Sequence, residues 1–440
     1  MALIIENALV ADLGGTFHPR GHVVISGSRV DAVGQGPVPA GPEAERLDVG
    51  GRLVTPGLVN AHTHLYSALA RGMPLPGFSP QGFRQILEQL WWKLDRALDL
   101  DLVYHSALVG GLAHLRAGVT ALFDHHASPR AIDGALSAVK QAAVEEVGLR
   151  ADLCYEVTDR GGVGQRDAGL AENLRFAREE ADGERCAAHL GLHASFTLSD
   201  STLERAAAAA DAAKLAFHLH LAEGKEDPVD ALHKYAVRTV ERLDRFGILT
   251  EGTLLAHGIH LSTAEVELLA QRPATVIHNP RSNMNNAVGA AQVESLLARG
   301  VRAGLGTDGF GCDLLGELLT ARILAHHVSG DPTAFADPTA AALLEQNYAL
   351  AGVAFGTPMG KLAPGYAADL VVWDYTPPTP LQADNLLGHL LFAAISEGLR
   401  PCHVMVAGQF RLADGKVVDM DEPAVLARAR EAAGRLWSSL

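Results

Sequence analysis

The sequence of 440 residues lacks several features that would place it in a common class of protein. It has no run rich in Lys or Arg, and 51 acidic against 36 basic residues give a net charge of −15. We therefore expect no nucleic-acid partner. No apolar stretch approaches the roughly 20 residues that a bilayer demands, which excludes a membrane-spanning helix. The start, MALIIENALVAD, has no basic region before a short apolar run, so we expect no signal peptide.

Cysteine is also scarce. The four cysteines are scattered and form no CxxC pair, which is typical of free thiols in a cytoplasmic protein. A G-x-S-x-G nucleophile elbow is absent, which disfavours an acyl-enzyme hydrolase. What the chain does have is a globular composition, 48% hydrophobic and 20% charged, with ample material for a large core.

The two ends of the chain share a β-rich texture. Short apolar runs punctuated by Gly and Pro fill residues 1–55 and recur after residue 365, as in ADLVVWDY and PCHVMVAGQFRLADGKVVD. We predict that residues 1–55 and 365–440 together form one small β-sandwich domain. The final stretch, EPAVLARAREAAGRLWSSL, has the apolar spacing of a helix.

The middle of the chain alternates between apolar runs and helical patterns such as DSTLERAAAAADAA, STAEVELLAQR and AAQVESLLARG. Strand–helix alternation predicts a parallel sheet, and eight repeats predict a closed (β/α)8 TIM-type barrel of the α/β class over residues 56–364. The eight runs are LVTPGLVNAHTH, GVTALFDHH, GLRADLCYEV, RCAAHLGLHAS, KLAFHLHLAE, GTLLAHGIHL, PATVIHNPRSN and GVRAGLGTDG.

Several of these runs end in residues that bind metal ions. His62 and His64 lie two apart in the first run and share one face of an extended strand. His220 ends the fifth run and Asp308 the eighth. Because the carboxyl ends of barrel strands converge, three imidazoles and a carboxylate can hold a zinc-like ion and leave a place for water. Each residue could instead be a hydrogen-bonded core residue, but agreement among several strand ends favours a metal site.

The same strand ends offer catalytic groups. Glu223 follows His220 by three residues and is free to donate a proton. Asp308 is the natural base for a bound water, whose pKa a metal lowers to about 7. His257, in the sixth run, would orient the attacked group or stabilise developing charge. The fourth run contains no lysine to bridge two ions, so we predict one divalent ion per subunit, zinc first, with Fe²⁺ or Mn²⁺ as alternatives.

Other residues are candidates for substrate contacts. His193 and His126 could contact the substrate or serve the core. The segment from Tyr66 to Asp101 carries Gln81 and Trp91, which could hydrogen-bond and stack on a flat ring, although Trp91 and Trp92 could instead anchor this segment or a subunit contact. Arg281 and Asn283, after the seventh run, could bind polar ring substituents. The histidines expected to be structural are His218, His260, His326 and His327.

Motifs along nearly the whole chain resemble those of the amidohydrolase superfamily, in its mononuclear aminohydrolase branch. They are PGLVNAHTH, HLAE, AHGIHL, HNPRSNMNN, GLGTDG and KLAPGYAADLVVWD. WWKLDRALD, FDHHASP, HNPRSNMNN and YTPPTPLQADNLLGH are closer still to the SsnA-type aminohydrolases. HHASP and RSNMNN differ from the corresponding segments of nucleoside and thioadenosine deaminases, so the resemblance does not identify the substrate.

The resemblance implies that metal-bound hydroxide deaminates an amino-substituted purine, pterin, pyrimidine or triazine and releases ammonia. It assigns His62, His64, His220 and Asp308 as ligands, Glu223 and His257 as proton-handling residues, and His193 as a substrate contact. Two alternatives stay open: hydrolysis of a cyclic amide or of another leaving group, and a non-catalytic scaffold barrel. A small-molecule substrate and a homo-oligomer, dimeric or larger, are expected.

Overall fold

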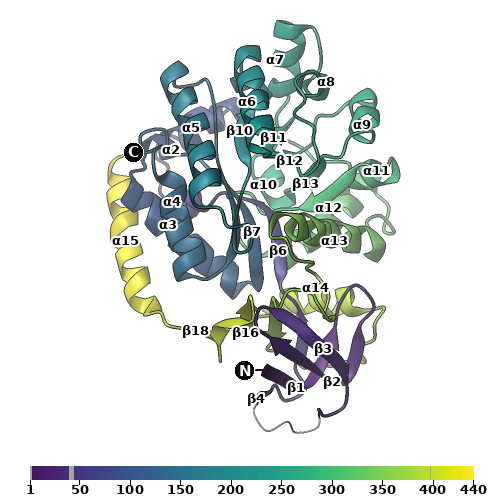
Figure 1. Cartoon of the computed structure of the whole chain (residues 1–440). Coiled ribbons are helices and arrows are strands. Elements are labelled where there is room, and N and C mark those ends of the chain that lie inside the picture. Colours follow the sequence, from purple (N-terminus) through teal and green to yellow (C-terminus); the bar gives the residue numbers. More distant parts are fainter. Residues whose placement is uncertain (1, 39–43, 397) are drawn as a thin grey trace.

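The computed structural model describes residues 2–38, 44–396 and 398–440 (Figure 1). Among these residues, no helix has both the length and the apolar character needed to cross a membrane. One nine-stranded sheet takes strands from both ends of the chain, in the order β18-β17-β16-β15-β5-β1-β2-β3, with β4 beside β1. These strands are β1 (Ala2–Ala11), β2 (Phe17–Ser26), β3 (Arg29–Gln35), β4 (Glu45–Asp48), β5 (Leu53–Pro56), β15 (Leu370–Trp373), β16 (Pro401–Val406), β17 (Gln409–Ala413) and β18 (Lys416–Val417).

The two ends of the chain meet where β5 pairs with β15. The pairing is antiparallel, with Val54 opposite Val372 and Pro56 opposite Leu370. Val54 and Leu370 also belong to one buried apolar cluster, together with Ile5 of β1 and Met405 of β16. Residues far apart in the sequence therefore share one sheet and one core.

The remaining strands are parallel and follow the order of the chain, as β6-β7-β8-β9 and β10-β11-β12-β13-β14. Two isolated parallel bridges, Val157–Leu192 and Thr63–Asp308, link these two sheets. Most of these strands are buried along their whole length, as expected for parallel strands covered by helices. Their bounds are β6 (Leu58–Thr63), β7 (Val119–His126), β8 (Arg150–Tyr155), β9 (Cys186–Ala188), β10 (Leu190–Ala194), β11 (Phe217–Leu221), β12 (Leu254–His257), β13 (Thr275–His278) and β14 (Arg302–Leu305).

Helices alternate with the parallel strands and lie outside them (Figure 1), which confirms the predicted α/β class. Local signals explain several starts: the Ser262 hydroxyl and the Glu265 side chain form a capping box at α9, and Ser199 caps α6. The helices are α3 (Leu100–Arg116), α4 (Ala135–Lys140), α5 (Val163–Glu179), α6 (Asp200–Ala213), α7 (Glu226–Tyr235), α8 (Thr239–Arg245), α9 (Thr263–Leu269), α11 (Val293–Ala298), α12 (Leu314–Ser329), α13 (Asp337–Ala354) and α14 (Leu386–Ser396).

Shorter helical segments lie near the carboxyl ends of the parallel strands. The long connection after β6 folds into η1 (Leu65–Ala70), α1 (Phe83–Ile86), η2 (Leu87–Trp91) and α2 (Trp92–Ala97), and α10 (Pro280–Asn285) follows β13. Further helical turns are η3 (Gln141–Glu146), which continues α4, and η4 (Ser195–Thr197). The predicted C-terminal helix is present as α15 (Glu422–Ser438).

Helix α15 packs against α3 and η1, beside the parallel strands (Figure 1). The Trp437 indole donates a hydrogen bond to the Leu69 carbonyl at 2.8 Å, and Arg116 pairs with Glu422. The C-terminal helix therefore leaves the terminal sheet and covers α3.

One buried ion pair joins the terminal sheet to the parallel strands. Arg150, at the start of β8, donates from Nε and Nη2 to the two carboxylate oxygens of Asp369, at 3.0 and 3.1 Å. We expect Asp369→Ala to lower the free energy of unfolding by about 3–5 kcal/mol, because it leaves a buried guanidinium unpaired. Denaturant-induced unfolding measures this change. The double variant Arg150→Met/Asp369→Leu should recover most of the loss, and a loss below about 1 kcal/mol for Asp369→Ala would contradict the assignment.

Candidate metal centre and active site

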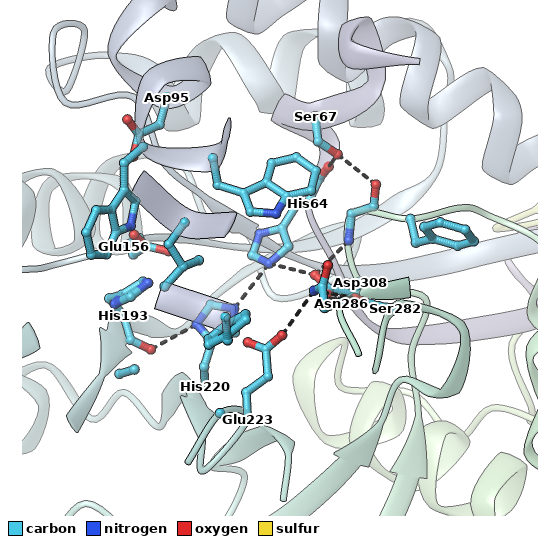
Figure 2. Close-up of a pocket in the computed structure, with 18 of the residues that line it drawn as sticks. His64, Ser67, Asp95, Glu156, His193, His220, Glu223, Ser282, Asn286 and Asp308 are labelled. Carbon is cyan, nitrogen blue, oxygen red and sulfur yellow. Dashed lines mark hydrogen bonds and ion pairs between the residues drawn. The ribbon is translucent and has the colours of Figure 1, made fainter. Parts of the chain in front are cut away.

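The three predicted imidazole ligands and the predicted carboxylate meet at the carboxyl ends of the parallel strands, and Figure 2 shows His64, His220 and Asp308 of this group. His62 and His64 come from the end of β6, His220 from β11, and Asp308 from the turn after β14. The Nε2 atoms of His64 and His220 are 3.2 Å apart. Asp308 Oδ1 lies 3.0 Å from His64 Nε2 and 3.7 Å from His62 Nε2. All four side chains are buried or nearly so.

The hydrogen bonds of the three rings show which nitrogen faces the centre. His64 Nδ1 donates to the carbonyl of His125 at 2.5 Å, and His220 Nδ1 donates to the carbonyl of His193 at 2.9 Å. His62 Nδ1 lies 2.7 Å from His218 Nε2, while His62 Nε2 is buried without a hydrogen-bond partner among the described residues. With each proton on Nδ1, three bare Nε2 lone pairs point at one another and at a carboxylate. This arrangement is unfavourable unless a cation lies between them.

The spacing of these atoms fits a zinc-like ion. Two nitrogens bound at 2.0–2.1 Å with tetrahedral angles stand roughly 3.3 Å apart, close to the observed separation of His64 and His220. Burial lowers the pKa of His62 to about 3, so the ring is neutral at pH 7 and can give an electron pair to a metal ion. Burial also disfavours a charged His64, but its contact with Asp308 outweighs this and raises the pKa of His64 to about 9. A proton on His64 Nε2, or a metal ion bound there in its place, would supply the positive charge that stabilises the Asp308 carboxylate.

Glu223 lies beside this centre with the properties of a proton donor. Burial and the nearby Asp308 hold the pKa of Glu223 well above its usual range, so the carboxyl keeps its proton. Asn286 Nδ2 donates to Glu223 Oε1 at 3.2 Å and fixes the group. Asp308 is the opposite case: burial would raise its pKa, but His62 and His64 hold the pKa well below its usual range. The site thus contains one neutral and one ionised carboxyl group.

His257 faces the same space from the end of β12. Its Nδ1 lies 2.7 Å from Asn283 Oδ1, which accepts the proton, so the bare Nε2 points inward. Nε2 lies 3.4 Å from Glu223 Oε2 and 3.8 Å from Asp308 Oδ2. Both His257 and Asp308 adopt left-handed backbone conformations, with φ of 79° and 53°. Such strain costs about 1–3 kcal/mol per residue and is concentrated at functional sites.

A pocket of about 800 Å³, its open mouth included, leads to these groups. This size suits a small-molecule ligand. Its walls include His64, His220, Glu223 and Asp308, and an aromatic side made of Phe83, Trp91, Trp92, Phe196 and Phe310. The long segment after β6 supplies three of these aromatics, because its short helices place Phe83, Trp91 and Trp92 over the strand ends.

The predicted substrate contacts separate into two groups. His193 and Trp91 line the pocket. Asn283 is buried behind His257, and His126 is buried with its Nε2 2.9 Å from the Ser128 hydroxyl. The structure also places Arg281 and Gln81 outside the pocket lining: Arg281 is half-buried against Thr320, Asp313 and Glu317 of α12 and the turn before it, and Gln81 is exposed.

Sequence reasoning missed several pocket residues. The Ser282 hydroxyl donates to Asp308 Oδ2 at 2.5 Å, and Asn286 Nδ2 donates to Glu223 Oε1. Both residues lie in the segment RSNMNN, in which the sequence predicted Arg281 and Asn283 as the substrate contacts instead. Glu156 also lines the pocket. It is the last polar residue of the run GLRADLCYEV, so it occupies a strand end as His220 does.

His218 contacts the candidate metal centre through His62. A ligand Nε2 on His62 requires that Nδ1 donate to His218 Nε2, which is 2.7 Å away. Because such outer contacts orient metal ligands, we expect His218→Leu to weaken zinc binding about 10- to 100-fold. Competition with a chromophoric chelator measures this affinity. His327→Ala, on the outer helix α12, is the matched control, and equal affinities for the two variants would show that His218 does not orient the ligand.

Comparison with known proteins agrees with this geometry. Residues 53–417 match the sequence profile of the Amidohydrolase family. The chain belongs to the amidohydrolase family. As a member of that family, it is a hydrolase that acts on carbon–nitrogen bonds. This confirms the resemblance seen in the sequence motifs.

Named relatives of this amidohydrolase cover its full length. It is 33% identical over 100% of both chains to a 5-methylthioadenosine/S-adenosylhomocysteine deaminase of Desulforudis audaxviator. It is 32% identical to a 5′-deoxyadenosine deaminase of Methanothermobacter thermautotrophicus, with 99% of each chain covered. A solved zinc-bound adenosine deaminase from Xanthomonas campestris has a TM-score of 0.85 and 26% identity, covering 99% of this chain and 98% of the other. These neighbours support a divalent metal, with zinc favoured.

Proposed function

We propose that this amidohydrolase removes the exocyclic amine of an adenosine-type purine by hydrolysis and releases ammonia. The observation that carries the proposal is the convergence of the Nε2 atoms of three imidazoles, an ionised Asp308 and a protonated Glu223 at the end of one pocket. The full-length relatives named as deaminases of adenosine derivatives support the choice of ring.

We propose that His62, His64, His220 and Asp308 hold one divalent ion per subunit. When bound there, such an ion lowers the pKa of water to about 7 and polarises the group under attack. The end of the fourth run, where a second bridged ion would need a lysine, carries His193 instead, and its Nδ1 bonds the Thr197 hydroxyl at 2.7 Å. A single ion is therefore favoured.

The side chains divide the proton transfers between them. Asp308, held by the Ser282 hydroxyl, accepts one proton of the attacking water and passes it to the leaving amine. Glu223 gives its proton to the neighbouring ring nitrogen as the carbon–oxygen bond forms, and the second proton of the water restores it. The carbon–nitrogen bond then breaks, leaving a ring carbonyl beside an N–H, and ammonia departs.

His257 orients the group under attack. Because Asn283 takes the Nδ1 proton, Nε2 can accept a hydrogen bond but cannot donate one. Stabilisation of negative charge, one of the two roles predicted for His257, would require a proton on Nε2. We therefore favour the positioning role for this residue.

We further propose that the two parallel sheets are halves of one closed (β/α)8 barrel over residues 56–364. The bridges Val157–Leu192 and Thr63–Asp308, one at each junction of the two sheets, support closure. Residues 1–55 and 365–440 would form the small β-sandwich domain, for which the shared core of β1, β5, β15 and β16 argues.

An ammonia-release screen with zinc-loaded enzyme tests the function. Adenosine, 5′-methylthioadenosine and 5′-deoxyadenosine are expected to yield ammonia, and guanine, pterin, cytosine and aminotriazines to react more slowly. Formation of a new carboxylate without ammonia would favour ring opening instead. Absence of both products across the panel, with zinc bound, would overturn the proposal.

A further inference from the structure

The pocket carries an acidic wall away from the metal centre. Five carboxyl groups line the pocket, whereas no lysine or arginine occurs among its described lining residues. Glu223 and Asp308 belong to the catalytic end, and Asp227 accepts hydrogen bonds from the backbone of Phe196 and Ala222. Among the described residues the Asp95 and Glu156 side chains accept hydrogen bonds from Arg160 and from no backbone group, and Figure 2 shows them on the side of the pocket opposite Asp308.

Asp95 and Glu156 are held together by one guanidinium. Arg160 Nη2 donates to Asp95 Oδ2 at 2.9 Å and to Glu156 Oε1 at 3.1 Å, and the group lies 4.7 Å from the centre of the Trp92 ring. All three charged side chains are largely buried, with 2%, 5% and 11% exposure for Asp95, Glu156 and Arg160. Arg160 itself does not line the pocket, so it positions the two carboxylates and the indole.

Each carboxylate keeps one oxygen that Arg160 does not bind. Asp95 Oδ1 is buried with no hydrogen-bond partner in the described part of the chain. Glu156 Oε2 lies 3.5 Å from His125 Nδ1 and accepts no hydrogen bond from Arg160. A buried acceptor without a donor costs free energy, so this wall is suited to a ligand that brings N–H or O–H groups.

We propose that Asp95 and Glu156 set the charge selectivity of the substrate pocket: they admit a substrate whose far end is neutral or cationic and carries hydrogen-bond donors, and they reject a phosphate at that end. This inference rests on the proposed function, because the amine-bearing carbon must lie beside Glu223 and Asp308. The opposite end of the same molecule then reaches the acidic wall. Like charges facing each other in a desolvated site are strongly disfavoured.

Three ligands that differ only in charge at one end test this selectivity. Adenosine, 5′-amino-5′-deoxyadenosine and adenosine 5′-monophosphate are titrated calorimetrically into the zinc-loaded Glu223→Gln enzyme, in which turnover is slowed. We expect the monophosphate to bind at least about 100-fold more weakly than adenosine, and the amine to bind as well as adenosine or better.

Charge-removing variants identify the residues responsible. Glu156→Gln and Asp95→Asn should each reduce the preference for adenosine over its monophosphate about 10-fold. Asp133→Asn removes the same charge at an exposed position outside the pocket and should leave the preference unchanged. Equal weakening of all three ligands would indicate a merely structural role and would overturn the proposal.

The remaining outcomes are also decisive. Tight binding of the monophosphate would make Arg160 an anion receptor and reject the inference, as would failure of all three ligands to bind. If the charge preference holds but the wild-type enzyme releases no ammonia from adenosine, the proposed function fails while the selectivity of the wall stands.

Discussion

Replacing Asp308 by asparagine is expected to reduce turnover by about 10⁴-fold, the upper end of the range for general acid–base catalysis. The variant keeps the size of the side chain but loses the ionised carboxylate that contacts both His62 and His64. It also loses the acceptor of the proton that must reach the leaving amine. Initial rates of ammonia release, measured at saturating zinc with metal content assayed in parallel, give the effect.

Ser282→Ala is the matched control for Asp308→Asn. It removes the hydroxyl that donates to Asp308 Oδ2 but leaves the carboxylate in place. A hydrogen bond to a charged group is worth about 1.5–3 kcal/mol, so the loss should be about 10- to 100-fold. If Asp308→Asn retained more than a tenth of the wild-type rate with zinc bound, Asp308 would not be the base.

Glu223→Gln is expected to lower kcat by about 10²- to 10⁴-fold while zinc binding is unchanged. Glutamine can still accept from Asn286 but has no acidic proton for the ring nitrogen. Glu223 is not in any of the described groups of residues that could hold a metal ion, so the metal content should equal that of the wild type. Steady-state kinetics together with metal analysis separate the proton-donor role from a ligand role.

The neighbouring Glu226→Gln provides the comparison for Glu223→Gln. Glu226 lies three residues further along, outside the pocket lining, where it accepts from the Arg84 backbone at 3.3 Å. Its variant should keep kcat within about twofold of the wild type, as substitutions away from special features usually do. A loss of zinc in Glu223→Gln would instead make Glu223 part of the metal site.

Much of the site could be predicted because its residues occupy strand ends. His62, His64, His220 and Asp308 follow apolar runs, and the carboxyl ends of parallel strands lie on one side of the sheet. The structure brings these four together as predicted from that rule. Glu156 obeys the same rule and was missed, because the sequence around it offers no second signal.

Contacts made by residues on connecting segments were harder to predict. Arg281 and Asn283 follow the same strand as Ser282 and Asn286, yet only the last two reach the pocket. Helix α10 rotates successive residues by about 100°, so its register decides which side chains point inward. Gln81 and Trp91 likewise lie on one long segment, and only its folding places Trp91 in the pocket wall.

The amino-acid sequence by itself determined the α/β class through apolar periodicity and the family through its motifs, and it indicated which residue types end the strands, because these are local properties. Tertiary structure alone decided the rest. It directed the proton of each imidazole toward a carbonyl or another ring, kept the proton on Glu223 through burial, and brought Asp95 and Glu156 to the same Nη2 atom of Arg160. Protonation and charge pairing depend on desolvation and on distances between segments far apart in the chain, which no local pattern encodes.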